Sequence, residues 1–205
     1  MCWARACKIQ CWTTCGVCSR KDLKNSGKVR KSRSRSRIVY SQGRTAVLKN
    51  RSGKGYIGGY YRNKYEGAGY LINGLQKGDK YYGSFKNGKF QGKGTYIYRN
   101  GDKYTGSFNR GKFHGKGKLV KKNGEKYTGD WRADKKHGKG KWLNKYGESY
   151  TGTFRNDVGN GYGVWKHPDG DVYKGQFKND LFWGKGTYTY SDGYVEKGNW
   201  RQGYL

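Results

Sequence analysis

The sequence predicts an all-β protein: an elongated, single-sheet solenoid of stacked antiparallel β-hairpins, with a basic, cysteine-containing arm at its N-terminus. Three observations predict this class. Tyrosines recur every 23 residues, glycines and aromatic residues follow them at fixed offsets, and apolar and polar side chains alternate as they do in a strand. We therefore expect residues 56–205 to form the repeat array and residues 1–55 to form the arm, largely extended or ordered by a partner.

Each copy of the repeat opens with a tyrosine, followed by a glycine two residues later and by a second aromatic residue two further on. Two more glycines follow at eleven and thirteen residues past the tyrosine. An earlier copy begins at Tyr56 and a partial one at Glu196, which makes six copies and a remnant. The expected aromatic core comprises Tyr81, Phe85, Tyr104, Phe108, Tyr127, Trp131, Tyr150, Phe154, Tyr173 and Phe177.

Each copy is interpreted as one hairpin. In residues 103–108, Tyr104, Gly106 and Phe108 share one parity, so they face the same side of a strand. Glycine normally weakens a strand, but here it recurs beside aromatic residues, and we expect it to make room for a ring of a neighbouring strand. Dipeptides such as Asn123-Gly124 separate the copies and are typical of tight hairpin turns.

The pattern Tyr-x-Gly-x-aromatic, followed by Gly-x-Gly at a period of 23, closely resembles MORN repeats over residues 56–205. Asp134, Asp157 and Asp180 stand where that family usually has a turn glycine, and we expect them to bend or cap the array. The resemblance implies a scaffolding or dimerising module of cytoskeletal, junctional or flagellar proteins, or a module appended to an enzyme. Stand-alone copies in large DNA viruses and lipid binding are further implications of the resemblance.

The charge is strongly positive, with a formal net value of +30. Residues 1–55 hold 15 basic and 1 acidic residue, while residues 56–205 hold 29 and 13. Such an excess indicates an anionic partner, which is an acidic protein, an acidic lipid surface or nucleic acid. It also suits a solvated face that keeps a sheet soluble.

Lysines recur on the polar parity of the repeat, either between the paired glycines or directly before the tyrosine. Stacked hairpins would align them in columns with steps of about 10 Å. The predicted anion- or partner-binding residues of these columns are Lys80, Lys93, Lys103, Lys116, Lys126, Lys139 and Lys185.

No catalytic site is expected, and the chain is interpreted as a non-enzyme without cofactor or metal. Segments such as GKFQGKGT, residues 88–95, lack the spacing of a phosphate-binding loop, which also requires a following helix. His114 and His137 occupy equivalent repeat positions about 10 Å apart, too far to share a metal ion. His167 precedes Pro168 in a predicted loop.

The N-terminal arm is basic and poor in apolar residues after its first 18 positions. A polyanion such as nucleic acid is expected to bind residues 19–40 through charge alone, or the segment is a disordered tail. The basic residues named for this role are Arg30, Lys31, Arg33, Arg35 and Arg37. Residues 38–50 are expected to form a short hairpin that caps the array.

The cysteines fall at helical spacing near the N-terminus, where they would form one stripe with Trp3 on a helix. Packing against a partner, acylation, zinc binding and crosslinking to other proteins are the alternatives, with partner packing preferred over acylation and zinc. The residues concerned are Cys2, Cys7, Cys11, Cys15 and Cys18.

The function predicted from these features is a non-enzymatic structural protein that mediates protein–protein contacts in a larger assembly. That assembly is a cytoskeletal scaffold or the particle of a large DNA virus, in which the chain would be a minor capsid or cement component. The alternatives are recruitment to anionic phospholipid and non-specific nucleic-acid binding through the arm. The sequence shows no signal peptide and no membrane-spanning run, so we expect an intracellular, cytoskeleton- or membrane-associated, or virion location. A homodimer through the C-terminal sheet edge is a further expectation.

Overall fold

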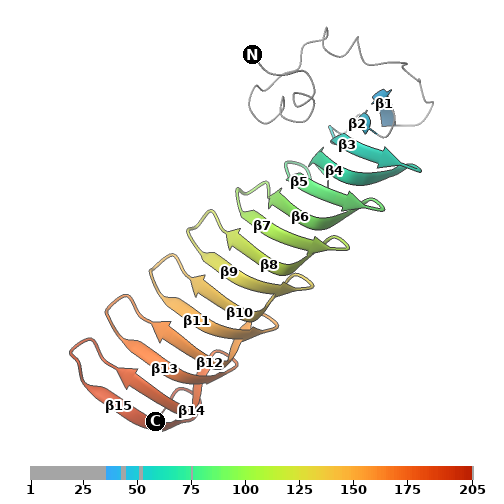
Figure 1. The fold of residues 1–205 in the computed structure, drawn as a ribbon. Coiled ribbons are helices and arrows are strands. Elements are labelled where there is room, and N and C mark those ends of the chain that lie inside the picture. The colour runs from blue at the N-terminus through green and yellow to red at the C-terminus, as the bar shows by residue number, and fades with distance from the viewer. Residues whose placement is uncertain (1–35, 43–44, 51–52, 75, 205) are drawn as a thin grey trace, which may run out of the picture. The chain divides into compact units, whose positions relative to one another are not determined.

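The computed structural model describes residues 36–42, 45–50, 53–74 and 76–204, and all the regular elements in these ranges are β-strands. The chain divides into two compact units, Met1–Arg99 and Asn100–Leu205. Within each unit the strands pair with their neighbours in sequence order and antiparallel, so the predicted all-β sheet of stacked hairpins is confirmed in both (Figure 1). No helix in the described ranges is long and apolar enough to cross a membrane.

The first unit contains six strands, in the order β1 to β6. The first two pair with each other, and β2 pairs with β3, so the sheet extends upstream of the first tyrosine repeat by one hairpin. The strands are β1 (Ser36–Gln42), β2 (Thr45–Asn50), β3 (Gly55–Tyr61), β4 (Lys64–Ile72), β5 (Lys80–Lys86) and β6 (Lys89–Ile97).

The second unit contains nine strands, in the order β7 to β15. In each hairpin a strand of seven residues is followed by one of nine, and β15 has six. The strands are β7 (Lys103–Asn109), β8 (Lys112–Val120), β9 (Lys126–Arg132), β10 (Lys135–Leu143), β11 (Ser149–Arg155), β12 (Val158–Lys166), β13 (Val172–Lys178), β14 (Leu181–Thr189) and β15 (Val195–Trp200).

A row of glycines crosses the second unit at right angles to its strands, with one glycine in each strand. The register pairs Gly117 with Gly106 and with Gly129, and the same pairing continues to β15. The row comprises Gly106, Gly117, Gly129, Gly140, Gly152, Gly163, Gly175, Gly186 and Gly198. Because these residues carry no side chain, the core face of the sheet has room for an aromatic ring close to the backbone along this row.

The repeat tyrosines lie over this glycine row. Tyr104 is fully buried, and its hydroxyl donates a hydrogen bond of 2.9 Å to the carbonyl of Ser107, three residues on. Tyr127 donates in the same way to the carbonyl of Asp130. All ten residues of the expected aromatic core are buried. The glycines therefore remove side chains where the rings must lie, and the hydroxyls satisfy carbonyls at the bend of the strand.

A second ring stacks on the tyrosine in several hairpins. The ring centroids of Tyr104 and Phe113 are 3.6 Å apart at an interplanar angle of 7°, and those of Tyr173 and Phe182 are 3.9 Å apart. Two hairpins of the second unit depart from this arrangement, because Lys136 and Gly159 occupy the position of the stacked phenylalanine. The Lys136 ammonium lies 5.3 to 6.0 Å from the ring centroids of Tyr127, Trp142 and Phe154.

The turn expected inside each copy is present, but the turns between copies differ from the sequence expectation. The tight turns lie inside the copies, at pairs such as Arg110-Gly111 and Asn156-Asp157, where both residues have positive φ. The Asn-Gly dipeptides belong to wider loops: in residues 121–125 only Gly124 has a positive φ, and Lys121 donates its N–H to the Glu125 carbonyl. The two-residue turn that Asn-Gly favours requires positive φ at both residues, and here only the glycine has it. These dipeptides therefore belong to longer loops and do not form two-residue turns.

The aspartates at the tight turns do not simply bend or cap the array. Each links its turn to the preceding hairpin: Asp157 donates its N–H to the Lys136 carbonyl, and its carboxylate accepts a 2.8 Å hydrogen bond from the Lys136 N–H. Asp134 and Asp180 make the same pair of bonds, to Phe113 and Gly159. Aspartate tolerates the left-handed conformation and adds an acceptor that glycine lacks.

Candidate functional site

The sheet of the second unit has two unlike faces. One carries the aromatic core. The other, which we call the lysine face, carries the alternate residues of each strand, and its exposed basic side chains are Lys103, Lys116, Lys118, Lys126, Lys139, Lys141, Lys166, Lys174, Lys185 and Lys197. Because side chains alternate along a strand, burial of the rings on one face places these lysines together on the other.

The structure aligns part of the predicted lysine columns. Lys103 and Lys126 both pair with Val120, from either side, so they lie two strands apart in one row, a distance of about 10 Å. Lys116, Lys139 and Lys185 occupy the same position in β8, β10 and β14, but β12 has Tyr162 there. The column is therefore interrupted by an exposed aromatic side chain.

A second set of lysines on this face was not among the predicted binding residues. Lys118 pairs with Thr105 on one side and Thr128 on the other, and Lys141 pairs with Thr128 and Thr151. Lysine and threonine thus alternate across the strands beside the glycine row. The signal was present in the sequence, since Lys118 and Lys141 share the parity of Lys116 and Lys139, two residues earlier.

A groove of about 780 Å³ runs along this face over β7 to β12. The glycine row forms its floor, and the lysines and threonines beside that row form its walls. The residues that line it are Thr105, Lys116, Gly117, Lys118, Thr128, Gly129, Lys139, Gly140, Lys141, Thr151, Gly152, Thr153 and Tyr162. Its axis lies across the strands, because its residues come from successive strands in register.

One carboxylate lies beside the groove. Asp130 accepts from the Lys116 ammonium at 2.7 Å and from the Lys139 backbone N–H at 3.0 Å. The Lys116 side chain is 77% exposed, so this ion pair adds little stability, although it neutralises part of the charge on one wall. The equivalent residue in β7 is Ser107, which shows that the repeat does not need a carboxylate here.

The acidic residues of the repeats are held by bonds within the chain. All 13 in residues 56–205 have a carboxylate contact, mostly with backbone N–H groups or with Tyr and Trp side chains. Lys116 and Lys121 form ion pairs with two of them. The acidic residues are Glu66, Asp79, Asp102, Glu125, Asp130, Asp134, Glu148, Asp157, Asp169, Asp171, Asp180, Asp192 and Glu196.

The acidic residues at the ends of the wide loops show most clearly that carboxylates bond within the chain. Glu148 accepts a 2.6 Å hydrogen bond from the indole N–H of Trp165, and Asp171 accepts one from the Tyr188 hydroxyl at the same distance. The Tyr188 bond lowers the pKa of Asp171. The Asp171 carboxylate therefore stays ionised at neutral pH while it holds the next hairpin.

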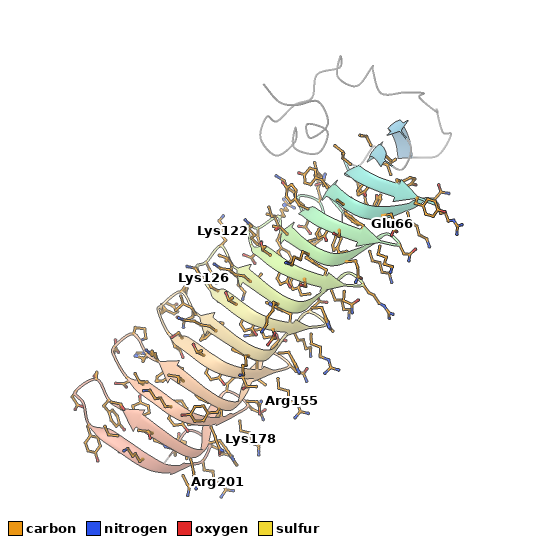
Figure 2. The ribbon with its side chains drawn as sticks, in the orientation of Figure 1. Glu66, Lys122, Lys126, Arg155, Lys178 and Arg201 are labelled. Atoms are coloured by element: carbon orange, nitrogen blue, oxygen red, sulfur yellow. The ribbon has the colours of Figure 1, made fainter. Side chains whose placement is uncertain are left out.

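A second basic surface follows the tight turns. We call it the turn edge; its exposed residues are Arg110, Lys112, Arg132, Lys135, Arg155, Lys178 and Arg201. Figure 2 shows Arg155, Lys178 and Arg201 projecting from this edge of the second unit and Lys122 and Lys126 projecting from the opposite one. Positive charge thus covers both edges of the second unit as well as one face.

The remaining predicted binding residues lie in the first unit or the arm. Lys80 and Lys93 are exposed on β5 and β6. The equivalent face of that unit carries Tyr70 and Tyr82, which stack with ring centroids 4.4 Å apart. Arg37 falls in β1, but its side chain is outside the described part. Arg30, Lys31, Arg33, Arg35 and the five cysteines Cys2, Cys7, Cys11, Cys15 and Cys18 also lie outside the described residues.

The structure describes the side chains relevant to metal binding within residues 36–42, 45–50, 53–74 and 76–204. No group of three or more His, Cys, Asp or Glu side chains within these ranges is placed to hold a metal ion. His114 is exposed on β8, and His167 lies 3.2 Å from the Asp169 carboxylate on the surface. What this surface offers is a dense, one-sided array of ammonium groups.

Comparison with known proteins identifies the repeat. The MORN repeat family matches residues 81–103, 104–126, 127–143, 150–172 and 173–193, more than half of the chain. No curated protein is significantly similar in sequence.

Two solved structures are similar at low identity. The TCP domain of SAS-4 (dCPAP) of Drosophila melanogaster, solved with a proline-rich motif of Ana2 (dSTIL), is 12% identical over 83% of this chain and 94% of that chain, with a TM-score of 0.45. Selenomethionine-substituted virginiamycin B lyase from Staphylococcus aureus is 10% identical over 75% of this chain and 68% of that chain, with a TM-score of 0.18. Neither likeness is close enough to bear on function.

Proposed function

The chain belongs to the MORN-repeat family, and on that premise we propose that it is a non-enzymatic assembly protein that binds acidic partner proteins. MORN repeats are non-enzymatic modules that generally make protein–protein or membrane contacts. The contact surfaces proposed for this chain are the lysine face and the turn edge. The proposed setting is a larger structure, either a cytoskeletal scaffold or, as a minor capsid or cement protein, the particle of a large DNA virus.

The observation that carries the proposal is that the acidic residues bond within the chain, whereas many lysines are exposed on its surface. Carboxylates such as Glu148 and Asp157 are bonded to indole and backbone N–H groups of the chain itself. Lysines such as Lys118 and Lys141 are exposed on one face. A chain that needed charge only for solubility would gain as much from acids and lysines interspersed on its surface. A positive surface that covers one face and both edges, but not the aromatic face, attracts an acidic partner and orients it.

Spacing supports a protein partner with several contacts. Successive lysines of one column are about 10 Å apart, close to the Debye length of about 8 Å at physiological ionic strength. Each exposed ion pair contributes only about 0.2–1 kcal/mol. Useful affinity therefore requires many pairs at once, which a partner with an acidic surface of matching length provides.

Purification of the chain from its native source at moderate ionic strength tests the proposal. We expect it to copurify at fixed stoichiometry with one or a few acidic proteins, and to be released by high salt. The turn-edge charge reversal Arg155→Glu/Lys178→Glu, which alters no core residue, should weaken that association. Recovery of the native chain as a free monomer at moderate ionic strength would count decisively against an assembly role.

Membrane recruitment, the second function of MORN repeats, is tested in parallel by flotation of the full chain with anionic vesicles. At about 150 mM salt, exposed charges are already largely screened beyond a Debye length. Flotation that survives these conditions and is lost in Lys103→Gln/Lys126→Gln would favour the lipid alternative. Absence of flotation leaves the protein partner as the function supported.

A further inference from the structure

The groove of the second unit is long and open to solvent. It crosses about five strand spacings, or about 24 Å, and has a volume of about 780 Å³. An extended chain laid along it would meet a glycine of the floor on every strand from β8 to β11.

The walls carry positive charge on both sides of that floor. Lys118 and Lys141 lie on one side of the glycine row, and Lys116 and Lys139 lie on the other. Because Asp130 pairs with Lys116, these four ammonium groups give a net charge of about +3 over about 24 Å, or one charge per about 8 Å of groove. A chain lying on the floor would therefore have a lysine within a Debye length at every point along the groove.

The other lining groups add donors and one aromatic surface. Thr105, Thr128 and Thr151 lie in the same row as Lys118 and Lys141, and threonine hydroxyls donate to anionic oxygens. Tyr162 lines the groove over β12 with 65% of its surface exposed, so its ring face is open to stacking. The floor has no side chains, so it offers no pocket that distinguishes one side chain or base from another.

We propose that this groove binds the sugar–phosphate backbone of a single-stranded nucleic acid, without sequence preference. A positive groove that follows the backbone, together with an aromatic side chain on which a base stacks, is the usual means of binding single strands. The lysines neutralise phosphates, the threonines donate to their oxygens, and the bases point out of the groove toward Tyr162 and solvent. This activity goes beyond the proposed assembly contacts, although it uses lysines of the same face, and it does not involve the N-terminal arm.

A nucleic acid fits better than an acidic peptide, the other extended polyanion. A phosphodiester chain carries its charge on the backbone, so a thin thread brings the charge to the walls. An acidic peptide carries its carboxylates at the ends of side chains that alternate between two sides. Only some of those carboxylates would therefore reach the lysines, and the glycine floor has no recess for the side chains that point toward it.

The test is the binding of the full chain to a fluorescent oligodeoxythymidylate of about 12 nucleotides, within the usual site size of single-strand binders. Anisotropy is followed over a series of salt concentrations. The groove variant is Lys118→Gln/Lys139→Gln/Lys141→Gln. Its matched control, Lys112→Gln/Lys122→Gln/Lys135→Gln, removes the same charge from exposed positions outside the groove and leaves the arm unchanged. Circular dichroism verifies that both variants are folded.

The logarithm of the association constant falls linearly with the logarithm of the salt concentration. Each lost phosphate contact makes that slope shallower by about 0.7 for a single strand. We expect the groove variant to have a slope smaller by about 2 and an affinity at least about tenfold weaker, against less than about threefold for the control. Asp130→Ser should bind more tightly than the unaltered chain, because it removes the one carboxylate beside the groove. This variant also keeps the test decisive should the triple variant fold poorly.

Two outcomes would overturn the inference. If the groove variant and its control lose affinity equally, binding depends on diffuse charge or on the arm. The second outcome is that polyglutamate of equal charge displaces the labelled oligonucleotide at the same concentration as unlabelled oligonucleotide does, and displaces it less well from the groove variant. In that case the groove binds acidic peptides.

Discussion

The ring of Tyr127 lies so close to Gly140, on the paired strand, that a Cβ atom on this glycine would be 2.5 Å from the tyrosine hydroxyl oxygen and 2.6 Å from a ring carbon. The hydroxyl is held in place, because it donates to the Asp130 carbonyl at 2.9 Å. The same relationship recurs along the array. Glycine at these positions is thus a packing requirement, which explains a tyrosine-rich core in a chain with 36 glycines.

Gly140→Ala should lower the free energy of unfolding by about 1–3 kcal/mol, the usual cost of adding a methyl group to a packed core. Gly140 has no left-handed backbone, so the effect would be steric rather than conformational. Denaturant unfolding measures it. Thr128→Ala, at an exposed position of the paired strand, is the control and should change stability by less than about 0.5 kcal/mol. Equal effects of the two changes would refute close packing of the ring on the glycine.

Lys136→Phe should raise stability by about 1 kcal/mol, the scale of one aromatic pair. Lysine occupies here a position that phenylalanine fills at Phe113 and Phe182, and burial among aromatic rings lowers its pKa even though Asp157 and Glu125 oppose the shift. A lowered pKa means that the unfolded chain binds more protons near pH 10 than the folded chain. The advantage of phenylalanine should therefore shrink as the pH rises toward that value, which thermal unfolding at several pH values would show. A loss of stability in Lys136→Phe would contradict this interpretation of the site.

Alkaline pH should unfold the protein cooperatively. Burial raises the pKa of Tyr150 to about 12 and raises the pKa values of Tyr81, Tyr104 and Tyr127 as well. The folded state holds these protons more tightly than the unfolded chain, whose tyrosines ionise near pH 10. Stability should be unaffected by tyrosine ionisation below about pH 10 and fall as the pH rises from there through the raised values. Tyrosinate absorption and circular dichroism should change together; full ionisation of these tyrosines near pH 10 in a folded chain would be inconsistent with their burial.

Asp157→Gly should lower the free energy of unfolding by about 1 kcal/mol. Glycine accepts the left-handed backbone of Asp157, with φ of 77°, but lacks the carboxylate that accepts from the Lys136 N–H at 2.8 Å. Asp157→Asn retains an oxygen acceptor and should cost less. Chemical denaturation of the three chains compares them. Identical midpoints for the glycine variant and the unaltered chain would show that the carboxylate does not link the two hairpins.

The constant spacing of tyrosine and glycine was enough to predict the hairpins, because successive copies with this spacing pair in one register. It could not reveal the bonds from Glu148 to Trp165 or from Asp157 to Lys136, since these join residues 17 and 21 positions apart and depend on how one hairpin lies against the next. The groove was missed for a related reason. Its floor is made by glycines that the register places side by side in successive strands, which parity within one strand does not show.

Carbodiimide crosslinking of the native assembly, read by mass spectrometry, tests most directly whether the lysine face binds partners while the carboxylates serve the fold. This reagent couples an amine to a carboxylate in direct contact. The ion pairs of Lys116 with Asp130 and of Lys121 with Glu125 supply internal positive controls. We predict that lysines of the lysine face, including Lys103, Lys126 and Lys185, couple to acidic residues of other proteins. If the two internal pairs couple and no lysine of this face couples to another chain, the central claim is wrong.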